Sequence, residues 1–118
     1  MTPRSARPGI DATLAALADP TRRGAVELLR VRPRRAGELA RALRRSAPVM
    51  SRHLRVLRTS GLVEDERVER DSRLRIYRLR REPFAELAGW IGRVEEFWGG
   101  QLAAFKAHAE GAPKRGGR

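Results

Sequence analysis

The chain has 118 residues, no cysteine and a formal net charge of +12 at pH 7. This length fits one domain, and the lack of cysteine excludes disulfides and thiol redox chemistry. The sequence has no apolar run long enough to span a bilayer, and its N-terminus lacks the apolar core of a secretion signal. We therefore expect a cytoplasmic protein.

The charge is distributed unevenly along the chain. Residues 20–80 contain 18 arginines against 7 acidic residues, a net charge of +11, whereas residues 81–110 contain 3 basic and 5 acidic residues, a net charge of −2. The codon usage of a GC-rich genome would favour arginine over lysine, but it does not determine where the charge lies. The asymmetry favours a polyanionic partner and predicts an affinity that falls steeply with salt.

Two short helices are predicted first. Residues 10–18 show helical spacing of apolar side chains, and Asp19-Pro20 then marks a break. Asp19 is a suitable N-cap, and Pro20 a suitable first residue, for a second helix that ends at Arg30. The apolar positions are Ile10, Leu14 and Leu17 in the first helix and Val26 and Leu29 in the second.

A helix-turn-helix is predicted next. Apolar residues recur at helical spacing over residues 36–43, and two residues separate this helix from Ser46. Ser46 can cap the following helix, whose first turn tolerates Pro48, and Gly61 suits the left-handed conformation after its end. The apolar positions are Ala36, Leu39, Ala40 and Leu43, then Met50, Leu54 and Leu57.

The outer face of the helix that follows Ser46 is basic and carries a hydroxyl. Ser51, Arg52 and Arg55 point away from its apolar stripe. A helix with these side chains can enter the major groove of DNA. The alternative is a surface helix whose arginines are only solvated.

After Gly61 the pattern changes to alternation, which predicts a β-hairpin. Residues 62–68 form the first strand, Glu69–Arg73 the turn, and Tyr77 lies in the second strand among Leu74, Ile76 and Leu79. The hairpin would carry outward a set of arginines that can hold phosphates or enter a minor groove. These are Arg67, Arg70, Arg73 and Arg75.

A long amphipathic helix is predicted from Pro83. Trp90 and Phe97 lie off its main stripe, so the helix has apolar groups on two sides and must bury both. Gly99 and Gly100 weaken the helix and favour a kink or break near them. The main stripe is Phe84, Leu87, Ala88, Ile91, Val94, Trp98, Leu102 and Phe105. The alternative is one wide stripe covered by the same chain.

The ends of the chain are rich in Pro, Gly and Arg. We expect disordered tails over residues 1–9 and 111–118 around one folded domain over residues 10–110.

Several motifs occur in an order typical of one family. They are Leu17-Ala-Asp-Pro-Thr-Arg-Arg, Gly-Glu-Leu-Ala from Gly37, Pro-Val-Met-Ser-Arg-His-Leu-Arg-Val-Leu from Pro48, Gly-Leu-Val from Gly61 and Tyr77-Arg-Leu. With these motifs, residues 10–110 resemble the ArsR/SmtB family of bacterial winged-helix repressors. The resemblance implies a mainly α fold with a small β-hairpin (α+β), with four helices, the hairpin and a fifth helix. It also implies a homodimer that binds a double-stranded operator near its own promoter and is released by a signal.

The residues expected to carry this function fall into three sets. The groove-facing set is Ser46, Ala47, Pro48, Ser51, Arg52 and His53. The phosphate-holding set is Arg55, Arg70, Arg73 and Arg75. The dimer interface is expected at Leu14, Leu17, Trp90, Ile91, Val94, Phe97, Trp98, Leu102 and Phe105.

No metal site or cofactor is expected. Metal-sensing relatives carry a Cys-x-Cys-type motif before the reading helix, or His and carboxylate ligands on the last helix, and Arg35 and Gly37 occupy the positions of the former. His108 stands alone near the end of the chain, whereas Zn²⁺ requires three or four protein ligands. The resemblance is therefore to the metal-independent branch, with a small molecule or a partner protein as the unidentified inducer.

Three residues depart from the family pattern. Ala47 replaces a frequent Gln and can meet a thymine methyl instead of making a bidentate adenine contact. Arg35 stands where Ser or Thr commonly caps the preceding helix, and Ser72 replaces the usual wing glycine.

Other functions fit the sequence less well. An enzyme would need convergent acid, base or nucleophile residues, whereas the chain has two isolated histidines and no glycine-rich phosphate loop. RNA binding or association with the ribosome is the alternative that would also explain the arginines, although RNA-stacking modules need exposed aromatics and the basic region offers only Tyr77. A winged helix used only for protein contacts is the third possibility.

Overall fold

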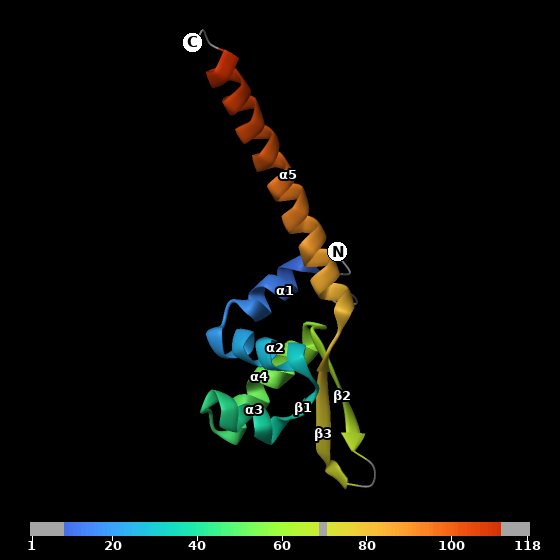
Figure 1. Cartoon of the computed structure of the whole chain (residues 1–118). Coiled ribbons are helices and arrows are strands. Elements are labelled where there is room, and N and C mark those ends of the chain that lie inside the picture. The colour runs from blue at the N-terminus through green and yellow to red at the C-terminus, as the bar shows by residue number, and fades with distance from the viewer. Residues whose placement is uncertain (1–8, 69–70, 112–118) are drawn as a thin grey trace. The chain divides into compact units, whose positions relative to one another are not determined.

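The computed structural model describes residues 9–68 and 71–111, without the side chains of residues 71–73. Over these residues the chain forms the helices and strands labelled in Figure 1. They are α1 (Ile10–Leu17), α2 (Pro20–Val31), β1 (Arg34–Arg35), α3 (Ala36–Leu43), α4 (Ala47–Thr59), β2 (Val63–Val68), β3 (Asp71–Leu79) and α5 (Arg81–Gly111). Two compact units result, the first ending at Ala85 and the second beginning at Glu86.

The start of α2 is capped as the sequence predicts. Asp19 Oδ1 accepts hydrogen bonds from the backbone N–H groups of Thr21 at 2.7 Å and Arg22 at 3.1 Å, and Pro20 takes the first helical position. The backbone N–H of Arg22 is the main cause that lowers the pKa of Asp19 below its ordinary value.

Two residues with positive φ set the limits of α3 and α4. Arg44, with a φ of 57°, is left-handed and ends α3, while the backbone N–H of Arg45 donates to Ala40 O at 2.9 Å. Ser46 Oγ then accepts from the backbone N–H of Val49 at 3.3 Å and caps α4. Gly61, with a φ of 83°, follows α4 as the sequence predicts, because glycine adopts this conformation without a Cβ penalty.

The core of the first unit is built around the inner face of α4. Met50, Leu54 and Leu57 are at most 1% exposed. They form one cluster with residues of α1, α2, α3 and the sheet. The other members of this cluster are Ala16, Ala25, Leu29, Leu39, Ala40, Leu62, Val63 and Tyr77.

The sheet has one strand more than the sequence predicts. Its order is β1-β3-β2, all antiparallel, with Arg34 of β1 opposite Tyr77 of β3. The strand β1 was not predicted because two arginines that pair along one edge show no alternation. The turn predicted over Glu69–Arg73 is too long, since β3 begins at Asp71, which is paired with Val68. Residues 69–70 lie outside the described residues.

A half-buried carboxylate joins the hairpin to the end of α4. Asp65 Oδ2 lies 3.0 Å from Arg75 Nη1 and 3.7 Å from Arg58 Nη1. The Asp65 side chain is 11% exposed, whereas both arginine side chains are more than 40% exposed. Asp65 of β2 therefore holds the last turn of α4 and the strand β3 in one arrangement.

The last helix is longer and less interrupted than the sequence predicts. It begins two residues before Pro83 and continues through Gly99 and Gly100, so the expected break is absent from the described residues 81–111. None of its residues is buried. Its large apolar side chains from Trp90 to Phe105 are 36% to 71% exposed.

Removing a side chain from the buried face of α4 is expected to destabilise the fold. Leu57→Ala should lower the free energy of unfolding by about 2–5 kcal/mol, because the side chain is fully buried and leaves a cavity. Urea denaturation followed by circular dichroism measures the loss. Val31→Ala, at a side chain that is 65% exposed, is the control and should cost under about 0.5 kcal/mol. Equal losses would contradict this assignment of the core.

Removing Asp65 is expected to loosen the hairpin from α4. Asp65→Ala should lower the free energy of unfolding by about 1–2 kcal/mol, because two arginines lose a charged acceptor that is mostly shielded from water. The neighbouring Glu66 pairs with Arg78 at 3.2 Å but its side chain is 66% exposed, so Glu66→Ala should cost under about 0.5 kcal/mol. The same denaturation experiment compares the two variants. If Asp65→Ala lowers the free energy of unfolding no more than Glu66→Ala does, the Asp65 ion pairs stabilise the fold no more than a solvent-exposed pair.

Candidate nucleic-acid interface

The outer face of α4 is open to solvent and basic. Ser51, Arg52 and Arg55 are exposed, and they lie opposite the buried stripe of Met50, Leu54 and Leu57. Among the described residues, the guanidinium groups of Arg52 and Arg55 have no hydrogen-bonding or ion-pairing partner. Both guanidinium groups are therefore available to phosphates or to base edges.

The first turn of α4 presents small side chains. Ser46, Ala47 and Pro48 are exposed, and Ser46 uses its hydroxyl to cap the helix. The turn before it is held from behind, because Arg45 Nε donates to the buried Thr21 Oγ1 at 3.2 Å. A small, exposed and fixed helix N-terminus allows close approach to a groove.

His53 differs from the other residues of the groove-facing set. Its ring is half-buried, and its Nδ1 lies 3.2 Å from Nη1 of Arg22 in α2. The ring therefore lies at the border between the exposed face of α4 and the support beneath it. Arg22 was not among the predicted functional residues, although it belongs to the Asp-Pro-Thr-Arg motif on which the family resemblance rests.

The arginines of the hairpin are not equally available. Arg75, expected to hold phosphate, is engaged by Asp65 at 3.0 Å, and Arg78 by Glu66 at 3.2 Å. Arg70 and the side chain of Arg73 lie outside the described residues, as does the side chain of Ser72. Within the described part of the hairpin, Arg67 is exposed.

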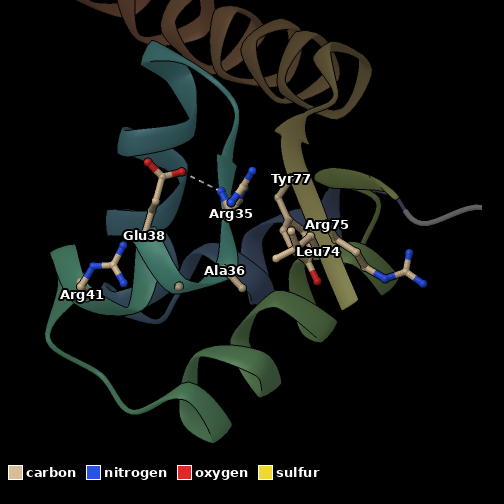
Figure 2. Close-up of a pocket in the computed structure, with 8 residues that line it drawn as sticks. Arg35, Ala36, Glu38, Arg41, Leu74, Arg75 and Tyr77 are labelled. Carbon is tan, nitrogen blue, oxygen red and sulfur yellow. Dashed lines mark hydrogen bonds between the residues drawn. The ribbon is translucent and has the colours of Figure 1, made fainter. Parts of the chain in front are cut away.

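A pocket of about 550 Å³ lies between the first turn of α3 and the strand β3 (Figure 2). Tyr77 forms part of its wall and is 9% exposed. Burial, and secondarily the charge of Asp65, raises the pKa of the Tyr77 hydroxyl. The hydroxyl is therefore neutral near pH 7, and the pocket adds no negative charge from this residue to the basic surface.

The start of α3 is capped by a glutamate. Arg35 precedes the helix, and its side chain cannot accept a hydrogen bond. Glu38 Oε1 accepts instead from the backbone N–H of Arg35 at 2.9 Å (Figure 2), and Glu38 Oε2 from Arg32 Nη2 at 3.2 Å. The backbone N–H of Arg35, followed by the Arg32 side chain, lowers the pKa of Glu38. The loss of the usual Ser or Thr cap is thus partly compensated.

The residues expected at a dimer interface lie in both units. In the first unit, Leu14 is 42% exposed, whereas Thr13 and Ala16 are the buried residues of α1. Leu17 is half-buried and packs against the core of its own chain. In the second unit the expected residues are all exposed, and they are Trp90, Ile91, Val94, Phe97, Trp98, Leu102 and Phe105.

The described residues offer neither a metal-binding cluster nor a membrane-spanning helix. No three His, Asp or Glu side chains of residues 9–68 and 71–111 gather where they could hold one metal ion. No helix in the described part of the chain is both long enough and apolar enough to cross a membrane.

Comparison with known proteins identifies the helix-turn-helix region. The model of the family described as "Bacterial regulatory protein, arsR family" matches residues 19–65, from the cap of α2 into β2. The HTH-type transcriptional regulator Rv2034 of Mycobacterium tuberculosis is 40% identical over 95 residues, which are 80% of this chain and 83% of that protein.

Solved structures agree with this match. An ArsR-like transcriptional regulator from Rhodococcus sp. RHA1 is 32% identical, with a TM-score of 0.71 over 86% of this chain and 90% of that one. The ArsR family transcriptional regulator RHA00566 is 29% identical, with a TM-score of 0.67 over 75% of this chain and 89% of that one. The chain therefore belongs to the arsR family of bacterial regulatory proteins, and is a DNA-binding transcriptional regulator with a winged helix-turn-helix.

Proposed function

We propose that the chain is a homodimeric repressor that reads its own operator without a metal and without enzymatic activity. The observation that carries the DNA-reading part is the exposed face of α4, where the guanidinium groups of Arg52 and Arg55 have no partner among the described residues while the opposite face is fully buried. Such a regulator acts in the cytoplasm, where the bacterial DNA lies. Its inducer would be a small molecule or a partner protein.

The groove contacts follow from the position of each side chain on α4. Ser46, Ala47, Pro48, Ser51 and Arg52 would face base edges, and Arg55 would hold a phosphate. In a symmetric dimer the two α4 helices would lie about 34 Å apart, in successive major grooves of a pseudo-palindromic site. From the hairpin, Arg70 and Arg73 would add phosphate contacts, joined by Arg75 if DNA competes with Asp65.

Independence from metal is supported by the side chains available. The chain has no cysteine, and Arg35 and Gly37 lie at the start of α3, where they offer no metal-binding atom. The test is an electrophoretic mobility shift of the DNA upstream of the protein's own reading frame, with excess unrelated duplex, with and without chelator. A discrete shift that resists competitor and chelator is expected. A shift abolished by chelator would refute metal independence, and one lost equally to any duplex would refute specific reading.

Dimerisation is supported by the apolar side chains of α5. Trp98 is 58% exposed and lies against Phe97, which is 59% exposed, with ring centroids 5.8 Å apart. Exposed aromatics in this number are unfavourable in water and are typical of a surface that is covered by another protein chain. A second copy of the chain would bury them, and the exposed Leu14 of α1 is a further residue that we assign to contacts between copies.

Arg52 is expected to contribute to sequence preference. Arg52→Ala should weaken operator binding about 10–100-fold, and should reduce the ratio of operator to unrelated-duplex affinity, because a base-edge contact is lost. Fluorescence anisotropy with both duplexes at one salt concentration measures this ratio. Arg30→Ala removes the same charge from α2, where Arg30 pairs with Glu27, and should leave the ratio unchanged. If Arg52→Ala behaves like Arg30→Ala, the proposed docking of α4 is wrong.

Trp98 is expected to hold the dimer together. Trp98→Asp should convert the protein to monomer and abolish tight operator binding, because it places a charge within the apolar surface. Light scattering coupled to size-exclusion chromatography measures the molecular mass. Glu96→Lys, on the opposite side of α5, changes charge without touching that surface and should remain dimeric. A dimer that survives Trp98→Asp would remove this residue from the interface.

A further inference from the structure

Arg22 makes contacts that join three helices. From α2, its Nε donates to Ala16 O at 2.7 Å and its Nη2 to Ala15 O at 3.5 Å, both in the last turn of α1. Its Nη1 lies 3.2 Å from His53 Nδ1 in α4. The guanidinium group therefore satisfies carbonyls at the end of one helix while it supports the side chain of a residue on the reading helix.

The backbone of Arg22 is held in place as well. Its N–H donates to Asp19 Oδ1 at 3.1 Å, and the same carboxylate accepts from Thr21. The side chain is half-buried, which restricts its rotamers. Because the cap fixes the backbone of Arg22 and burial restricts its side chain, the guanidinium group has a defined position relative to both α1 and α4.

The contact with His53 sets a condition on the imidazole ring. A guanidinium group can only donate, so Nδ1 of His53 must accept and cannot carry a proton. A protonated ring would place a second positive charge 3.2 Å from Arg22. Among the described residues outside α4, Arg22 contacts the ring and Asp19 interacts with it electrostatically. The negative charge of Asp19 reduces this repulsion, but it does not restore the hydrogen bond.

We propose that Arg22 is a positioning residue for DNA reading, which braces α4 against α1 through its hydrogen bond to Nδ1 of His53, and that protonation of Nδ1 breaks this hydrogen bond and weakens operator binding. The inference rests on the proposed docking of α4 in the major groove. It assigns His53 to the support of α4 rather than to the DNA itself. The two roles differ in sign, because a histidine on the DNA would strengthen binding to phosphate when protonated, whereas the support loses its hydrogen bond.

The first experiment compares two neighbouring arginines. Arg22→Gln should weaken operator binding about tenfold or more near pH 7.5, as expected for loss of a charged hydrogen bond. Arg23 is the matched control, because its Nη1 donates to Leu17 O of α1 at 2.8 Å and it is exposed. Arg23→Gln should stay within about twofold of the wild-type affinity. Melting temperatures and molecular masses of both variants separate positioning from loss of fold or of dimer.

The second experiment uses the fact that the chain has only two histidines. Lowering the pH from about 7.5 to about 5.5, the range in which histidines titrate, should weaken wild-type operator binding about tenfold. His53→Asn keeps an acceptor near the position of Nδ1 but does not titrate, so its affinity should be independent of pH in this range. His108→Asn should retain the wild-type pH dependence.

The outcomes separate this inference from the proposed function. A wild-type protein without operator preference near pH 7.5 would refute the proposed function itself. With operator preference intact, equal affinities of the two arginine variants would overturn the positioning role of Arg22. Binding that strengthens in acid, or a pH dependence that persists in His53→Asn, would overturn the role of His53. This pH arm remains decisive if Arg22→Gln fails to fold.

Discussion

The burial of one face of α4 determines what the other face can do. Met50, Leu54 and Leu57 are held in a core to which every other element of the first unit except β1 contributes. Rotation of α4 by even part of a turn would expose these side chains, at a cost of about 1.5–3 kcal/mol for each fully buried one. The direction in which Ser51, Arg52 and Arg55 point is thus a consequence of hydrophobic packing. The exposed side chains of Ser51, Arg52 and Arg55 themselves contribute little to holding the helix in place.

The arginines of the chain serve two different purposes. Arg22 and Arg45 donate to groups within the fold, as does Arg34, whose Nε donates to Leu28 O at 3.1 Å. The guanidinium groups of Arg52 and Arg55 make no such hydrogen bonds among the described residues. Net charge alone therefore overstates the cationic surface that is free for a polyanion. The long-range attraction toward DNA depends on the total charge, whereas the specific contacts depend on the few guanidinium groups that the fold leaves unpaired.

Much of this architecture can be predicted from the sequence, because its signals are local. The caps at Asp19 and Ser46 and the left-handed Gly61 each depend on residues that are neighbours in the chain, and all three are confirmed. Local sequence patterns do not predict contacts between residues that are far apart in the chain. The contact between Arg22 and His53 joins residues 31 positions apart, and the pairing of Arg75 with Asp65 requires the hairpin register, which the length of the turn determines. The helix α1 also buries Thr13 and Ala16, whereas the apolar pattern indicated Ile10, Leu14 and Leu17.

The glycines of α5 lower the intrinsic stability of that helix. An added Cβ at Gly92, Gly99 or Gly100 would meet no neighbour within 4 Å, so packing within the chain does not require glycine there. Each costs a helix about 1 kcal/mol relative to alanine. An isolated α5 would be only marginally stable, and its order would depend on what covers its aromatic side chains. If a second copy provides that cover, folding of the helix and association become one step. The fraction of operator-competent protein would then rise steeply over a narrow range of cellular concentration, so that the abundance of the protein would itself be a regulatory variable.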